Sequence, residues 1–203
     1  WIFIDPARRD NSGHKVVLLS DCEPDVTALE QTLLEKAQRI MVKCSPMLDI
    51  TAANKQLRSI EAIHVVAVNN ECKELLFILG ESKGADSPIT CVNIQKNRTE
   101  EFTFTVNEET CTATAYSNTI GRYLYEPNAA IQKAGCYRTL ATHMGIEKLH
   151  PNSQLFTADK LIPDFPGRRF KAEKVFGFTK REIKEISSIG KANITVRNFP
   201  DSV

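Results

Sequence analysis

The chain has 203 residues, of which 42% are apolar and 25% are charged, and its formal net charge is +1. This composition is typical of a soluble globular protein with one large or two modest domains. No stretch approaches the roughly 20 apolar residues that a membrane helix needs. The sequence therefore excludes a helical membrane protein, and we expect no membrane partner.

Six cysteines are scattered through the chain, with no C-x-x-C pair and no Cys/His cluster of zinc-ligand spacing. They are Cys22, Cys44, Cys72, Cys91, Cys111 and Cys136. Single cysteines spaced in this way are typical of reduced core residues in a cytosolic protein. We therefore expect a cytoplasmic location and no metal site.

The small net charge conceals an asymmetry between the two ends of the chain. Residues 1–120 carry 12 Lys and Arg against 17 Asp and Glu, a net charge of −5. Residues 121–203 carry 14 against 8, a net charge of +6. An acidic front and a basic back indicate two units with different partners, the second suited to a polyanion.

The front part alternates predicted strands and helices. Apolar and β-branched runs predict strands at 1–4, 16–21, 40–46, 59–70 and 89–95. Apolar residues at helical spacing predict helices at 26–37 and 47–57, and a short helix at 71–79. This alternation favours a doubly wound α/β sheet. The strand at 1–4 is apolar on both faces, so we expect it to be covered on both sides and the chain to be a fragment.

The back part has a different pattern. Two alternating runs around 107–109 predict an antiparallel hairpin within 98–120. Beyond it, short helices are predicted near 128–143 and 179–188, and short strands at 155–158, 174–178 and 192–198. The last helix and its two flanking strands form a predicted β-α-β unit, and the whole segment is typical of a small α+β domain.

The first candidate site is the tetrapeptide Asp5-Pro6-Ala7-Arg8, at the end of the first predicted strand. Ligands of open α/β sheets bind at the carboxyl edge of the strands, where a carboxylate and a guanidinium could contact a substrate. The alternative is that Asp5 caps a turn and that Arg8 lies in solvent.

The second candidate is Lys43-Cys44-Ser45-Pro46, at the end of another predicted strand. If the two strands are neighbours, both X-Pro corners face one cleft. Cys44 could be a nucleophile if a cation such as Lys43 lowered the pKa of its thiol. The alternative is a small buried apolar residue, because alternation along the strand points Lys43 away from Cys44.

The third candidate is a basic, aromatic stretch in the back part. Its cations are Arg168, Arg169, Lys171, Lys174, Lys180, Arg181 and Lys184, interleaved with Phe170, Phe176 and Phe178. Cations beside exposed rings can bind phosphates and stack bases. The alternative is that the rings belong to the core and the cations form an ordinary solvated face.

A phosphate-cradling motif is missing from the sequence. The nine glycines form neither G-x-G-x-x-G nor G-x-x-x-x-G-K-S/T. We therefore expect no cofactor-binding residues in this chain.

Four segments in this order and spacing carry a resemblance to a known family: FIDPARRD, SDCEPDV, KCSPMLDI and HVVAVNNECKELLF. Together they resemble the back half of bacterial class I S-adenosylmethionine-dependent methyltransferases with a ferredoxin-like insert and a THUMP-like C-terminal domain. The resemblance covers nearly the whole chain.

The resemblance implies the fold and its division. Residues 1–97 would be the back half of an α/β Rossmann-like methyltransferase sheet, with strands four to seven at 1–4, 40–45, 62–69 and 89–95. Residues 98–120 would be an antiparallel hairpin or ferredoxin-like connection, and 121–203 a THUMP-like α+β domain. Strands one to three, which hold S-adenosylmethionine in this family, would lie upstream of Trp1.

The resemblance also implies roles for the candidate residues. Asp5-Pro6-Ala7-Arg8 and Cys44-Ser45-Pro46 are similar to the D-P-[PA]-R and C-N-P elements of RNA uracil-5-methyltransferases, in which the cysteine attacks the base. Ser45 replaces the asparagine of that pattern. Asp5 and Arg8 would orient a base, Ser45 and Pro46 would shape its pocket, and Cys44 would be the nucleophile.

We therefore expect the C-terminal portion of an RNA methyltransferase, inactive without the missing front half, that uses S-adenosylmethionine and binds RNA through its basic part. One alternative is a non-catalytic RNA-binding protein on a degenerate methyltransferase scaffold. Another is a protein-interaction module whose basic part docks onto an acidic partner or onto the acidic front part of the same molecule. The oligomeric state is not predicted.

Overall fold

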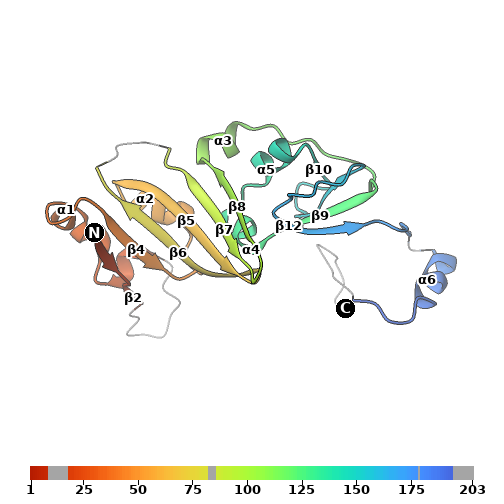
Figure 1. Ribbon diagram of the computed structural model, residues 1–203, viewed down its shortest axis with the longest axis horizontal. Coiled ribbons are helices and arrows are strands. Elements are labelled where there is room, and N and C mark those ends of the chain that lie inside the picture. The colour runs from red at the N-terminus through yellow and green to blue at the C-terminus, as the bar shows by residue number, and fades with distance from the viewer. Residues whose placement is uncertain (9–17, 82–85, 178, 194–203) are drawn as a thin grey trace. The chain divides into compact units, whose positions relative to one another are not determined.

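The computed structural model describes residues 1–203 except 9–17, 82–85, 178 and 194–203 (Figure 1). The chain divides into two compact units. The first comprises residues 1–112 and 128–140, and the second comprises residues 113–127 and 141–203. None of the described helices is long and apolar enough to cross a lipid bilayer.

A six-stranded mixed sheet forms the centre of the first unit (Figure 1). In spatial order its strands are β1 (Ile2–Ile4), β4 (Ile40–Cys44), β6 (Glu71–Leu79), β5 (Ile60–Val68), β7 (Ile89–Ile94) and β8 (Thr99–Phe104). The β1–β4 and β5–β7 pairs are parallel, and the other pairs are antiparallel. The predicted α/β class is thus confirmed as a mixed sheet.

The first strand lies at an edge of the sheet. Among the described residues β1 pairs only with β4, and Trp1 and Phe3 are 70% and 61% exposed. The sequence predicted that an apolar strand of this kind has neighbours on both sides in a longer protein, with strands one to three upstream. That expectation concerns residues outside this chain and stays a prediction.

The predicted helix at 71–79 is a strand. Asn69 and Asn70 have φ angles of 50° and 64°, the left-handed backbone that a two-residue hairpin turn requires. This turn reverses the chain, so that β6 pairs antiparallel with β5 and enters the sheet between β4 and β5. The segment 89–95, which was expected to be the seventh strand, forms β7 and pairs with β5 on the side opposite to β6.

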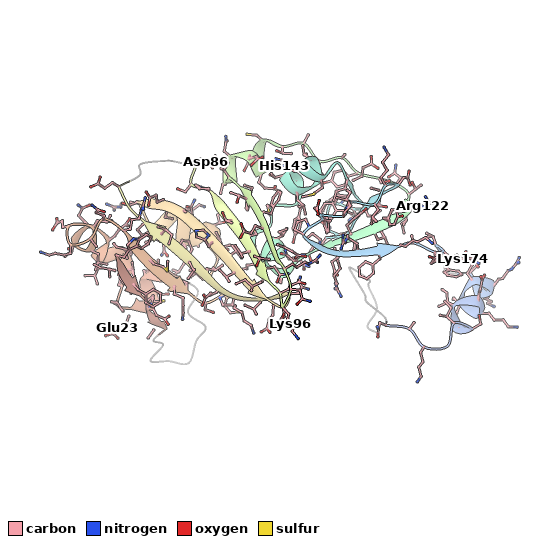
Figure 2. All side chains as sticks on the ribbon, viewed as in Figure 1. Glu23, Asp86, Lys96, Arg122, His143 and Lys174 are labelled. Carbon is pink, nitrogen blue, oxygen red and sulfur yellow. The ribbon has the colours of Figure 1, made fainter. Side chains whose placement is uncertain are left out.

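The predicted hairpin at 98–120 is also wrong. The hairpin is formed by β7 and β8, joined by the turn around Lys96 (Figure 2). Residues 107–109 lie instead in helix α3 (Val106–Cys111), whose N-terminus is capped by the Thr105 hydroxyl. Side-chain capping at Thr105 ends the strand and begins a helix, which the alternating pattern did not indicate.

Two of the helices of the first unit follow the sequence prediction. Asp25 caps α1 (Val26–Leu34) and Asp49 caps α2 (Ile50–Gln56), each through its carboxylate. The helical prediction at 128–143 corresponds to α4 (Ala129–Ala134) and α5 (Tyr137–Met144).

The segment predicted as a strand at 16–21 forms no strand where the structure describes it. Leu19–Asp21 forms a short 3-10 helix, η1, and residues 16 and 17 lie outside the described part. The small strands β2 (Ala7–Arg8) and β3 (Cys22–Glu23) pair antiparallel beside it.

A four-stranded antiparallel sheet forms the second unit. In spatial order its strands are β10 (Glu147–Lys148), β11 (Phe156–Ala158), β9 (Tyr123–Pro127) and β12 (Gly167–Lys171). Tyr125 and Phe165 are buried in its core, with ring centroids 5.0 Å apart. The predicted strand at 155–158 is confirmed.

The end of the chain keeps its helix but not the predicted strands beside it. Helix α6 (Lys180–Ser187) begins at a capping box formed by Thr179 and Glu182. Residues 174–177, near Lys174 in Figure 2, form no strand, and of the strand predicted at 192–198 only residues 192 and 193 are described. The predicted β-α-β unit is therefore not seen in the described residues.

Candidate functional site

The two X-Pro corners lie at one edge of the first unit's sheet. β1 and β4 are parallel neighbours, with Ile4 opposite Val42. Asp5 follows β1 directly, and Lys43 is the last residue but one of β4. The structure thus brings together the two segments that the sequence singled out, as expected for neighbouring strands.

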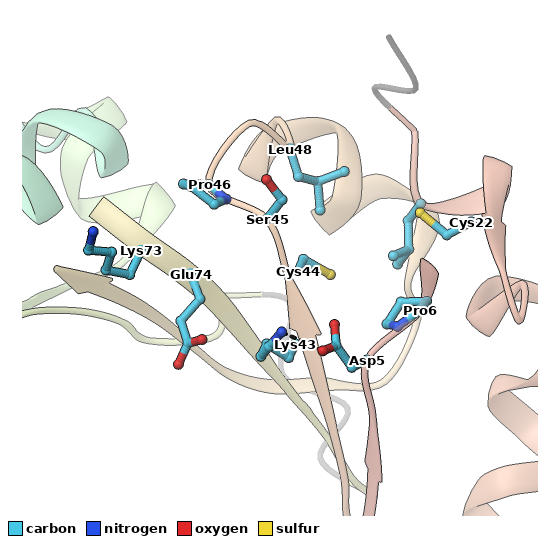
Figure 3. A pocket seen from close by; sticks show the side chains of 11 residues that line it. Asp5, Pro6, Cys22, Lys43, Cys44, Ser45, Pro46, Leu48, Lys73 and Glu74 are labelled. Carbon is cyan, nitrogen blue, oxygen red and sulfur yellow. Dashed lines mark hydrogen bonds and ion pairs between the residues drawn. The ribbon is translucent and has the colours of Figure 1, made fainter. Parts of the chain in front are cut away.

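A pocket of about 260 Å³ lies between the corners (Figure 3). Its apolar walls are Pro6, Leu19, Pro46 and Leu48. Its polar and sulfur-bearing groups are Asp5, Cys22, Lys43, Cys44, Ser45, Lys73 and Glu74. Convergent polar groups beside apolar walls are a feature of ligand sites, and in this pocket the polar and sulfur-bearing residues outnumber the apolar ones.

Asp5 and Lys43 form an ion pair at the mouth of this pocket. The Lys43 ammonium donates to Asp5 Oδ2 at 2.5 Å (Figure 3). This hydrogen bond, with the negative charges of Asp5 and Glu74, raises the pKa of Lys43, although burial acts against the shift. Lys43 therefore remains a cation and holds the Asp5 carboxylate in place.

The other predicted residues of this edge contribute in different ways. Cys44 is a buried residue that lines the pocket. The Ser45 Oγ accepts a hydrogen bond from the Met47 N–H at 3.3 Å, which fixes the turn after β4. Pro6 is buried. Arg8 lies in β2, and its side chain is outside the described part of the structure.

Sequence reasoning missed three polar residues of the pocket: Cys22, Lys73 and Glu74. The last two lie on β6, which was expected to be a helix. Recognition of the Asn69-Asn70 turn would have predicted β6 as a strand paired with β5. Its pairing with β4, which brings its side chains to the pocket, depends on the strand order of the whole sheet.

Several cations of the predicted basic site are bound to other residues of the second unit. Arg168 pairs with Glu126, a carboxylate that is only 4% exposed, and Arg169 donates to the Pro163 carbonyl. Lys171 binds Glu173 at 2.8 Å.

The remaining predicted cations of this unit lie farther along the chain. Lys174 pairs with Glu185, and its ammonium lies 4.9 Å from the centroid of the Phe176 ring. Lys180 and Arg181 are exposed at the start of α6. Phe178 lies outside the described residues. Three of the seven predicted cations, Arg168, Lys171 and Lys174, are thus paired with carboxylates of the same unit.

Neither a metal nor a nucleotide cofactor finds a complete site in the residues that are described. The described residues that line the pocket include no glycine, so none of them forms a Gly-rich loop. No group of three or more His, Cys, Asp or Glu in the described part could hold a metal ion. These residues do not fit a binding site for S-adenosylmethionine.

One comparison with known proteins matches part of the chain, in a range that includes residues 128–140 of the first unit. The sequence model of a ferredoxin-like domain matches residues 123–166. This range begins beyond the 98–120 segment in which a ferredoxin-like connection was expected. The match covers most of the four-stranded sheet of the second unit.

The whole chain resembles longer proteins. Two Mycobacterium tuberculosis proteins, from strains CDC 1551 and H37Rv, are named uncharacterized S-adenosylmethionine-dependent methyltransferases. Each is 25% identical over 225 residues, covering 100% of this chain and 54% of the relative.

A solved structure resembles the chain over nearly its full length. It is the crystal structure of a Porphyromonas gingivalis W83 protein that is assigned as a methyltransferase. It matches with a TM-score of 0.90 and 36% identity, covering 99% of this chain and 50% of that one. The chain therefore spans about half the length of the relatives it matches, and their names support the methyltransferase resemblance.

Proposed function

We propose that this chain is the acceptor-binding part of an S-adenosylmethionine-dependent methyltransferase that modifies a nucleotide in RNA. The observation that carries the proposal is the pocket at the carboxyl edge of β1 and β4, lined by both X-Pro corners. The names of the relatives support methyl transfer as the chemistry.

The residues of the pocket would receive and hold the acceptor base. Pro6 and Pro46 provide rigid apolar walls, and Ser45 holds the turn that carries Pro46. Asp5, fixed by Lys43, would accept a hydrogen bond from the base. Positioning of this kind can supply a large share of the barrier reduction in a transfer reaction.

Two predicted roles remain proposals. Arg8 would help orient the base from β2. Cys44, on the pocket wall, would be the nucleophile if the acceptor atom is a ring carbon that needs activation. In a protein that joins this chain to the cofactor-binding half, replacement of Cys44 by Ala would then abolish methylation and base adduct formation, whereas a purely structural Cys44 would tolerate the change.

S-adenosylmethionine would supply the methyl group from its sulfonium. We propose that the residues that bind it belong to the half of the relatives that this chain does not match. Calorimetric titration of S-adenosylmethionine into this chain and into the full-length Porphyromonas gingivalis relative tests this. Binding by the relative alone supports the proposal. Tight binding by this chain contradicts it, and so does a lack of binding by both proteins.

A non-catalytic RNA-binding function is the second candidate, favoured by the net charge of +6 over residues 121–203. Lys180 and Arg181 are the test positions, because both are exposed at the start of α6. Each phosphate contact that is removed lowers the slope of log K against log salt by about 0.7 for single-stranded RNA. A Lys171→Ala variant, in which the lost cation is already paired with Glu173, is the matched control and should change the slope less.

If single-stranded RNA binds with no dependence on salt, the RNA-binding function is refuted. If RNA binds and the relative also binds S-adenosylmethionine, the methyltransferase proposal gains over the scaffold alternative.

A further inference from the structure

Two phenylalanine rings of the second unit each lie beside a cation that a carboxylate holds. On β12, the guanidinium carbon of Arg168 lies 5.7 Å from the centroid of the Phe170 ring, and Arg168 pairs with Glu126. Glu126 is directly opposite Arg168 on β9, and its side chain is only 4% exposed. This ion pair fixes the guanidinium on the sheet beside the ring, because a buried carboxylate loses stabilisation when its cation moves away.

The same arrangement recurs farther along the chain, between β12 and α6. The Lys174 ammonium lies 4.9 Å from the centroid of the Phe176 ring and pairs with Glu185 of α6. In both cases the cation precedes its ring by two residues in the sequence. Each set therefore combines a carboxylate, a cation and a ring, and we call the two sets the Phe170 group and the Phe176 group.

An apolar hollow lies next to both rings. Phe176 lines a hollow of about 760 Å³, and Leu124, which also lines it, is the cross-strand partner of Phe170. Directly opposite residues of antiparallel strands share one face of the sheet, so Phe170 lies beside the hollow. Phe170 is 46% exposed, and Phe176 is half-buried. A flat ligand can therefore contact either ring from the solvent side. The other apolar walls of the hollow are Ile120, Ala172, Val175, Ile186 and Ile189.

The charge around the hollow favours a polyanion as the ligand. Residues 168–191 carry eight Lys and Arg against three Glu, a net charge of +5. An apolar hollow alone would also suit a protein partner, but this excess of positive charge matches a phosphate backbone. Single-stranded RNA supplies both the charged backbone and flat, unstacked bases, which proteins bind on aromatic rings and beside arginine side chains.

We propose that Phe170 and Phe176 each stack an unpaired base of single-stranded RNA, and that the ion-paired Arg168 and Lys174 line the edges of these two base sites. Because both cations are already neutralised by carboxylates, they add contact with the base rather than net charge. The exposed cations of α6 would contact the phosphates. The inference rests on the proposed function, because it takes RNA as the ligand, and it specifies how the second unit holds that RNA.

Binding of an oligoadenylate of about 12 nucleotides to this chain tests the inference without any need for activity. The comparison ligand is an abasic oligonucleotide of the same length, which keeps the phosphates and lacks the bases. Phe170→Ala and Phe176→Ala should each weaken oligoadenylate binding by about 5- to 150-fold, the range for the loss of one stacked base. Binding of the abasic ligand should not change. The slope of log K against log salt should also stay that of the parent, because no cation is removed.

Two further variants separate stacking from a loss of structure. Phe170→Trp keeps an aromatic ring and should keep the affinity. Its fluorescence should be quenched by oligoadenylate and not by the abasic ligand, and the parent chain, whose one tryptophan is Trp1, gives the background signal. Leu161→Ala is the matched control, because Leu161 is 51% exposed in the same unit and does not line the hollow. It should bind oligoadenylate as the parent does.

The outcomes separate this inference from the proposal of RNA binding. If oligoadenylate binds but either Ala variant binds it as tightly as the parent, stacking at that ring is overturned and RNA binding stands. The same holds for both rings if the abasic ligand binds as tightly as oligoadenylate. If neither ligand binds the parent chain, the inference and RNA binding by this unit are both overturned. If the Ala variants lose self-association in size-exclusion chromatography and keep their RNA affinity, the hollow is a protein interface and the inference is overturned.

Discussion

Replacement of Glu100 should strongly destabilise the first unit. This buried carboxylate lies on β8 and binds three side chains. Its Oε2 accepts from the Asn93 and Asn128 amides at 2.9 and 3.0 Å, and its Oε1 accepts from Arg98 at 2.5 Å. Asn128 in turn caps α4 through a bond to the Ile131 N–H. The network thus ties the start of α4 to the sheet.

The size of the effect follows from the groups left behind. In Glu100→Ala the amides of Asn93 and Asn128, which are 0% and 1% exposed, lose an acceptor inside the protein. Each unsatisfied buried donor costs about 1–3 kcal/mol. With the lost Arg98 contact, we expect the free energy of unfolding to fall by about 3–5 kcal/mol. This is a large share of the roughly 5–15 kcal/mol of a typical domain.

Urea denaturation followed by far-UV circular dichroism measures this change. Glu101→Ala is the control, because Glu101 is exposed on the same strand and its loss should change the free energy by less than about 0.5 kcal/mol. Glu100→Gln keeps an acceptor for the amides and should lie between the two. A Glu100→Ala variant within about 1 kcal/mol of the parent would refute the reasoning that the network stabilises the unit.

Three further changes have expected outcomes. Gly135 ends α4 with a φ of 75°, a backbone conformation that alanine adopts only with strain. Gly135→Ala should therefore lower the free energy of unfolding by about 1 kcal/mol, measured by urea denaturation. An unchanged urea midpoint would exclude backbone strain at this position. Arg168→Ala removes the cation beside the buried Glu126 carboxylate and should lower the free energy of unfolding by about 1–3 kcal/mol, measured by thermal unfolding; an unchanged melting temperature would contradict this. Arg39 lowers the pKa of Glu61 below its ordinary value of 4.5, so this pair stabilises the fold above that pH and the effect is lost as the pH falls through the folded pKa. Glu61→Gln should therefore be less stable than the parent at neutral pH and equal to it in acid, and a pH-independent difference in urea midpoint would rule the ion pair out as its cause.

Local signals account for the parts of the fold that the sequence predicts well. The Asp25 and Asp49 carboxylates cap their helices by accepting from backbone N–H groups two or three residues farther along the chain. The capping box of α6 is similarly local. β4 and β5 are apolar, β-branched runs that form strands in the sheet. These elements depend on neighbouring residues, so their existence and approximate bounds can be read from one chain.

The segment 71–79, whose identity depends on distant partners, was predicted wrongly. Its leucines lie at spacings that suit either a helix or a strand, and pairing with β4 and β5 decides for the strand. The energy of pairing between segments far apart in sequence has no local signature, so periodicity could not identify this strand.

The candidate site also has features that the sequence predicts and features that only the tertiary structure determines. Residue order alone indicates that Asp5-Pro6 and Lys43 to Pro46 end two strands and carry polar groups, because an X-Pro step restricts the backbone locally. Only the tertiary structure decides that those strands are parallel neighbours, that Lys43 binds Asp5, and that Glu74 reaches the same pocket from β6. These facts depend on strand order and register, which arise when the whole sheet buries its apolar face and not from any single segment.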